Sequence, residues 1–124
     1  MVTIDEAEAM LDEIAESLPD EIFERLNGGI ILRPEEKLSP HATSNNLYIL
    51  GEYCSSKMLG RYILIYYGSF ARIHGRLSPD DFREQLKKTL YHELTHHLES
   101  LAGEKDLEIK DAEKLREFLT EHGS

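Results

Sequence analysis

Residues 79–103 read PDDFREQLKKTLYHELTHHLESLAG, and this stretch decides the fold. Ser78 is a good helix cap and Pro79 suits the first helical position, so these two residues mark a strong helix start. No residue between Pro79 and Gly103 breaks a helix, and glycine is a common C-terminal stop. The sequence therefore predicts one long, uninterrupted helix from Pro79 to about Ala102.

An H-E-x-x-H motif, His92-Glu93-Leu94-Thr95-His96, lies within this helix. The helical period puts His96 only about 40° around the axis from His92 and one turn along it. Both imidazoles therefore leave one face, where they can hold one zinc ion. Glu93 lies about 100° around the axis, where it can reach a water on the metal without binding the metal. The leucines of the helix fall on the opposite, core-facing side: Leu90, Leu94, Leu98 and Leu101.

A catalytic zinc site uses three protein ligands and one open position, so a third ligand must follow His96. The acidic candidates are Glu99, Glu104, Asp106, Glu108 and Asp111. Glu99 shares the face of the histidines but lies about 10.5 Å along the axis from His92, so we expect it behind the ligands or facing the substrate. Gly103 lets the chain turn back, and Asp106 is the predicted third ligand. Two imidazoles and a carboxylate suit zinc best, with one ion per chain.

The motif and its surroundings resemble a known family. The run His92-Glu93-Leu94-Thr95-His96-His97, with the later Gly103-Glu104-Lys105-Asp106, resembles the small bacterial zincin-like metallopeptidases, also called minimal zincins. Their usual pattern is His-Glu-x-x-His-His-x-Gly-x-x-acid. Here Glu99 stands at the glycine position, and Asp106 matches the acid only after an insertion of four residues.

The resemblance implies a short sheet before the metal helix, and peptide or protein substrates. It also implies that a zinc-activated water hydrolyses the peptide bond, with Glu93 as the general base. An extended substrate is expected to lie along a sheet edge beside the helix, supplied by the second or the third strand.

The N-terminal part of the chain predicts helices. Apolar residues from Ile4 to Leu18 repeat at helical spacing, with acids on the other face. Pro19 ends this helix or opens a short second one, which is predicted to run to Leu26 before Asn27-Gly28-Gly29. At the other end of the chain, a last amphipathic helix is predicted from about Leu107 to Leu119.

The middle of the chain predicts a small three-stranded sheet. Runs rich in β-branched and aromatic residues mark three strands: Ile30–Leu32, Leu47–Tyr53 and Arg61–Tyr67. The segment Phe70–Ile73 is predicted to extend the last strand, and the polar residues 35–46 read as a loop. Helices, a small sheet and then helices indicate an α+β fold in a single domain, residues 1–124.

Composition excludes several classes of function. The 124 residues carry 24 acids and 14 bases, a formal net charge of −10, so a basic footprint for nucleic acid is missing. The longest apolar run, Tyr62–Tyr67, is far shorter than the roughly 20 residues of a membrane helix. The only cysteine, Cys54, cannot form an intrachain disulfide, and the N-terminus is acidic where a secretory signal is basic. A cytoplasmic protein is therefore expected.

A second class of function is weighed against the peptidase. Nine acids and no base in residues 1–24 fit a non-catalytic, acidic protein-interaction module that carries a degenerate zincin site. Glu99 at the glycine position and the small size of the chain favour this alternative. Glu93 opposes it, since a structural zinc site has no need of that residue. Of the other histidines, His97 either steadies Glu93 or is a simple flank residue, and His41, His74 and His122 are assigned no role.

Overall fold

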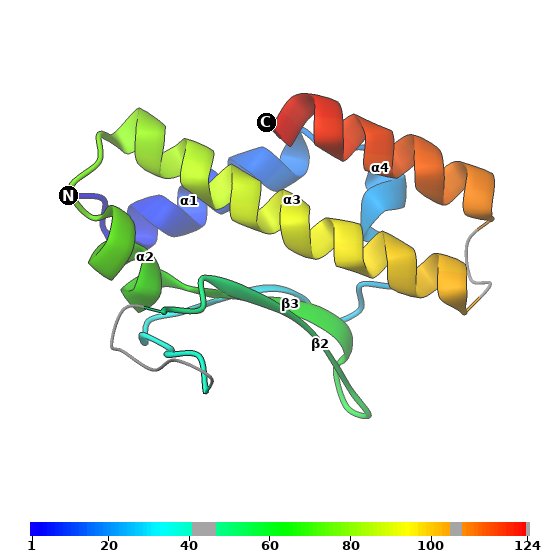
Figure 1. The fold of residues 1–124 in the computed structure, drawn as a ribbon, viewed down its shortest axis with the longest axis horizontal. Coiled ribbons are helices and arrows are strands. Elements are labelled where there is room, and N and C mark those ends of the chain that lie inside the picture. The colour runs from blue at the N-terminus through cyan, green and yellow to red at the C-terminus, as the bar shows by residue number, and fades with distance from the viewer. Residues whose placement is uncertain (41–46, 105–107, 124) are drawn as a thin grey trace.

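A three-stranded mixed sheet packs against the long helix that carries the motif (Figure 1). The computed structural model describes residues 1–40, 47–104 and 108–123. The elements are, in order, α1 (Ile4–Glu16), the 3₁₀ helix η1 (Asp20–Phe23), β1 (Gly29–Arg33), β2 (Gly51–Ser56), β3 (Gly60–Tyr66), α2 (Tyr67–His74), α3 (Pro79–Gly103) and α4 (Ile109–Gly123). The predicted α+β class is confirmed.

The sheet places β3 in its centre, in the order β1-β3-β2. β1 runs parallel to β3, with Ile31 opposite Leu64, and β2 runs antiparallel to β3 as a hairpin, with Tyr53 opposite Ile63. Both β1 and β2 are therefore edge strands. Of the three strands, β2 makes the most contact with α3.

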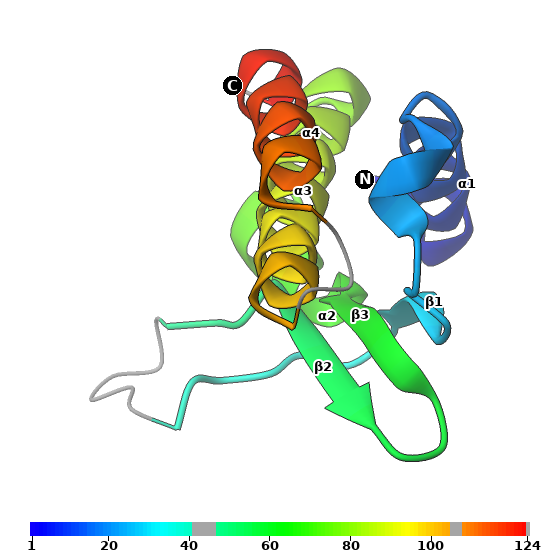
Figure 2. The ribbon, with the colours of Figure 1, turned by 90° about the vertical axis from the view of Figure 1, so that its right-hand side faces the viewer.

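The helices lie on one face of the sheet. Figure 2 shows α1 and α3 side by side above the strands, with α4 running along α3 on the side away from the sheet. The core between these layers is built from side chains that are fully buried, among them Ile63, Ile65, Leu90, Leu94 and Leu98. The predicted leucine face of the long helix is thus confirmed as its core face.

The helix starts follow the predicted local chemistry. The Ser78 hydroxyl accepts a hydrogen bond from the backbone N–H of Asp81 at 3.2 Å, and Pro79 stands at the first position of α3. In α1, Thr3 and Glu6 form a capping box, in which each side chain accepts from the other residue's backbone N–H. These caps satisfy backbone donors that the first turn of a helix leaves unpaired.

The predicted second helix, Pro19–Leu26, is too long. Only Asp20–Phe23 is helical, as the single 3₁₀ turn η1. Arg25 has a φ of 62°, in the left-handed region, and this conformation cannot continue a right-handed helix.

The predicted strand Leu47–Tyr53 is displaced along the chain, since β2 covers Gly51–Ser56. The backbone before it pairs with the preceding loop instead of the sheet. The Ile49 N–H donates to the Lys37 carbonyl at 2.7 Å, and the Ser39 N–H donates to the Leu47 carbonyl at 2.9 Å. These bonds hold residues 47–49 beside residues 37–39, outside the hairpin.

The prediction that Phe70–Ile73 extends the last strand is wrong, because these residues belong to helix α2. Phe70 is fully buried, and the Ser69 hydroxyl accepts a hydrogen bond from the Lys37 N–H at 3.0 Å. At Gly68, a side chain would meet the backbone of Glu35 and Glu36 at 2.6 Å, so the glycine lets that segment cross the start of α2. Within the described residues, no helix is long and apolar enough to cross a membrane.

Candidate metal centre and catalytic cleft

The two motif histidines lie together on the exposed face of α3. Their Nε2 atoms are 3.1 Å apart, and the rings meet edge to face with centroids 4.6 Å apart. Two nitrogens bound at about 2.05 Å to one tetrahedral zinc ion lie about 3.3 Å apart, so His92 and His96 fit such an ion. Without an ion, the same distance is that of a hydrogen bond between the two rings.

Glu99 lies at the other nitrogen of His96. One of its carboxylate oxygens is 3.6 Å from Nδ1 of His96, whereas Nε2 of that ring faces His92. Histidine ligands commonly place their second ring nitrogen beside a carboxylate, which fixes the ring and raises its basicity. Glu99 therefore fits the expected position behind the ligands, and it does not face the pair of Nε2 atoms.

The third ligand is not assigned by the described residues. Asp106, the predicted ligand, lies outside them. Among the alternatives, Glu104 pairs with Arg61, while Glu108 and Asp111 are exposed. In the part of the chain that the structure describes, no group of three or more His, Cys, Asp or Glu side chains is placed to hold a metal ion.

Glu93 is buried beside the histidine pair, with only 7% of its surface exposed. Burial raises the pKa of its carboxyl above the ordinary value, and the nearby His92 and His96 partly offset that rise. A hydrogen bond from the backbone N–H of Tyr53 also acts to lower the pKa. A carboxylate with a raised pKa is a better proton acceptor near neutral pH, as a general base requires.

His97 is fully buried, so the prediction of a simple flank residue is wrong. Its Nε2 lies 2.8 Å from the Glu24 carbonyl, and its Nδ1 lies 2.8 Å from the Tyr53 hydroxyl. A carbonyl only accepts, so Nε2 carries the proton. Burial lowers the pKa of the imidazole, which keeps the ring neutral and leaves Nδ1 to accept from Tyr53. Both nitrogens are thus used, and neither binds Glu93 directly.

A wide, shallow cleft of about 580 Å³, open to solvent, lies between β2 and the motif face of α3. It is lined by Glu52, Tyr53, Glu93, His96, Glu99 and Ser100. The general-base candidate and one metal-ligand candidate thus line one open cleft together with an edge strand. This juxtaposition depends on how β2 is placed against α3, and the motif alone did not reveal it.

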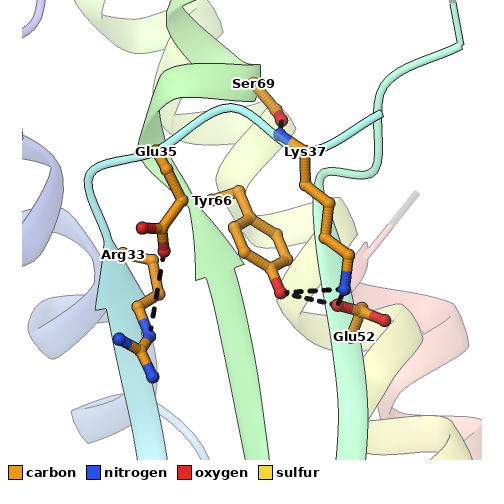
Figure 3. Close-up of polar contacts among 6 residues, drawn as sticks. All are labelled: Arg33, Glu35, Lys37, Glu52, Tyr66 and Ser69. Carbon is orange, nitrogen blue, oxygen red and sulfur yellow. Dashed lines mark hydrogen bonds and ion pairs between the residues drawn. The ribbon is translucent and has the colours of Figure 1, made fainter. Parts of the chain in front are cut away.

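A charged network that the sequence did not predict lies on β2 (Figure 3). The Glu52 carboxylate accepts hydrogen bonds from the Lys37 ammonium and from the Tyr66 hydroxyl, each at 2.6 Å. Burial alone would raise the pKa of Glu52, but the bonds from Lys37 and Tyr66 outweigh it and lower that pKa. The network ties the loop at Lys37 to the strand that borders the cleft.

The remaining candidates stay apart from this site. His74 lies in α2, with the centroid of its ring 5.8 Å from that of Phe70. His122 belongs to α4, and His41 lies outside the described residues. Cys54 is half-buried on β2, and burial raises the pKa of its thiol, which does not favour a nucleophile.

The sequence matches no family model and no curated protein. Its fold is similar to the solved structure of a conserved hypothetical protein from Thermo thermophilus, with 33% sequence identity and a TM-score of 0.71. The match covers 82% of this chain and 99% of that chain. The name of that protein assigns no reaction, so the likeness carries fold and family only.

Proposed function

We propose that this chain, which belongs to the same protein family as the conserved hypothetical protein from Thermo thermophilus, is a zinc-dependent metallopeptidase of the minimal zincin type. His92, His96 and Asp106 would hold one zinc ion, and Glu93 would act as the general base. The substrates would be peptides or proteins.

The observation that carries this proposal is the burial of Glu93 directly beside the histidine pair, within the cleft along β2. Burying a carboxylate costs free energy, and neither metal binding by the two imidazoles nor helix packing requires it. A hydrolytic site does require it, because the base must be held close to the water that attacks. The raised pKa of Glu93 points the same way.

The proposed hydrolysis uses both the zinc ion and side chains of the protein. Zinc, when bound, supplies an acidified water and a Lewis acid for the peptide carbonyl. Glu93 would take the proton from the attacking water and later give it to the amine of the cleaved bond. His92 and His96 would hold the ion through Nε2, and Glu99 would orient the His96 ring.

The substrate would pair with β2. Because β3 is interior, β2 is the edge strand next to α3. The Leu50 carbonyl accepts a hydrogen bond from the Tyr66 N–H. By the antiparallel pattern, the backbone N–H and C=O groups of even-numbered residues in β2 therefore point toward β3, and those of odd-numbered residues point away from it. The outward N–H of Tyr53 would bond Glu93, as its effect on the pKa of that carboxyl indicates, which would leave the backbone of Gly51 and Ser55 for an extended peptide.

Two measurements test the proposal. Zinc per chain is determined by elemental analysis on untagged protein, and hydrolysis of unstructured peptides is followed with and without a chelator. Glu93→Gln should keep the zinc and lower hydrolysis by about 10²- to 10⁴-fold, since only the base is lost. His96→Ala should lose the zinc, and Glu84→Gln, an exposed site on the same helix, should match wild type.

Undiminished hydrolysis by Glu93→Gln would overturn the mechanism. The alternative of a non-catalytic interaction module draws on the finding that the described residues supply only two ligands. That alternative predicts that the wild-type chain cleaves no peptide, with or without bound zinc.

A further inference from the structure

We infer that Tyr53 and His97 form a positioning pair that holds Glu93 in place for catalysis. The inference rests on the proposed function, because it assigns the pair to the same reaction. Neither side chain is assigned a contact with the metal or with the scissile bond. Both are proposed to act through the Glu93 carboxylate.

Tyr53 is fixed to α3 at two points. Its hydroxyl lies 2.8 Å from Nδ1 of His97. Its backbone N–H points away from β3, beside the cleft that Tyr53 and Glu93 both line, and acts as a donor that lowers the pKa of the Glu93 carboxyl. Glu93 and His97 are four residues apart, one turn of the helix, so the tyrosine spans that turn. The rings of Tyr53 and His97 are 5.4 Å apart at an angle of 59°.

His97 is in turn fixed from its far side. Its Nε2 donates to the carbonyl of Glu24, which follows η1 and lies 73 residues away in the chain. Both ring nitrogens therefore have partners, and the ring is fully buried. This second bond sets which nitrogen accepts from the tyrosine.

The pair would restrain a part of the site that no neighbouring strand holds. β2 is an edge strand, and the outward N–H of Tyr53 has no strand beyond it to pair with. A hydrogen bond from a group that moves would orient the carboxylate poorly. Anchoring the Tyr53 side chain to a buried imidazole fixes the N–H that holds one Glu93 oxygen, and the other oxygen stays available for water.

The first test uses substitutions of His97 that each retain the hydrogen-bonding group of only one ring nitrogen. Asn retains an acceptor at the Nδ1 position, and Gln retains a donor at the Nε2 position. Tyr53→Phe and His97→Gln should each lower kcat about 10-fold, or about 1.4 kcal/mol, with KM within about twofold and zinc content unchanged. His97→Asn should recover most of kcat, which a merely structural role would not produce.

A double variant checks that the two residues act as one unit. Tyr53→Phe/His97→Gln should be no slower than the worse single variant, because each change already breaks the shared bond. If the double variant lost kcat by the product of the two single losses, the two residues would act independently, and this would overturn the inference. Tyr48→Phe removes a tyrosine hydroxyl away from the cleft and should match wild type.

The second test needs neither zinc nor activity. In the metal-free protein, the Tyr53 amide should exchange its hydrogen at least about 10-fold faster in Tyr53→Phe and in His97→Gln than in wild type, and near the wild-type rate in His97→Asn. Glu93→Ala sets the fast limit. Unchanged exchange in Tyr53→Phe would overturn the positioning role, even in an active enzyme. If the wild-type Tyr53 amide is protected in this way but the protein cleaves no peptide, the anchoring of Tyr53 by His97 is supported. Only the proposed function is then overturned.

Discussion

Nδ1 of His96 lies 3.6 Å from a carboxylate oxygen of Glu99, on the ring nitrogen that does not face His92. In the proposed zinc site, one nitrogen of this imidazole would bind the metal and the other would face a supporting acid. Glu99, which stands at the glycine position of the minimal zincin pattern, would then lie behind the proposed ligand.

Glu99→Gln should therefore weaken zinc binding by about 10- to 100-fold without abolishing it, because the ring loses a charged partner but keeps its ligand nitrogen. Competition with a chelator of known zinc affinity measures the change. Glu84→Gln, on the same helix, is the matched control. Equal zinc affinity in Glu99→Gln and wild type would show that Glu99 does not support His96.

The third ligand can be assigned by comparing carboxylates after α3. Asp106→Asn should lower zinc affinity by at least about 10-fold, since the amide is a poorer zinc ligand than the carboxylate. Asp111→Asn and Glu108→Gln should bind zinc as wild type does. The same chelator competition measures the zinc affinity of each variant. A loss of affinity confined to Asp111→Asn or Glu108→Gln would assign the third ligand to that residue.

The Glu52 network predicts a pH dependence of stability. The folded chain lowers the pKa of Glu52 below its ordinary value of 4.5, so the folded state binds that proton less readily than the unfolded state. Its contribution to stability is complete above about pH 4.5 and is lost as the pH falls through the lowered pKa. Lys37 stays charged across this range.

Urea unfolding of wild type and Glu52→Gln at pH 7, 5, 4 and 3 should show this sign. The difference in unfolding free energy should be constant between pH 7 and 5 and shrink at pH 4 and 3. A difference that does not change with pH would mean that the carboxylate is equally protonated in both states.

Two glycines offer a matched pair for testing backbone packing. A Cβ at Gly68 would meet the Glu35 and Glu36 backbone at 2.6 Å, whereas a Cβ at Gly103 meets nothing within 4 Å. Gly68→Ala should cost about 1–3 kcal/mol of unfolding free energy, because backbone must move. Gly103→Ala should be neutral or stabilising, since alanine favours helix. Thermal unfolding of both variants checks this, and equal melting temperatures would contradict it.

Local signals explain what the sequence could predict. The start of α3, its leucine face and the shared face of His92 and His96 all follow from the period of one helix, and the structure agrees with them. The existence of three strands also follows from their β-branched and aromatic residues, although β2 begins at Gly51 and not at Leu47.

The errors arise where distant segments decide the outcome. Tyr67–His74 contains strand-forming residues, but Phe70 is buried at helical spacing and the loop at Glu35 crosses over Gly68. The Tyr53–His97 bond joins residues 44 apart in the chain. The helical period places His97 only about 20° around the axis from Leu90, on the leucine face, but no local pattern shows that its ring reaches β2.

β3 pairs with both other strands, but the chain that connects it to β2 is much shorter than the chain that connects it to β1. Only residues 57–59 separate β2 from β3, whereas residues 34–59 separate β1 from β3. Closing a short loop costs less entropy and is faster, so the hairpin can form before the parallel strand joins. The strand that borders the cleft is therefore held to β3 by a local contact, whereas the opposite edge of the sheet depends on a long-range one.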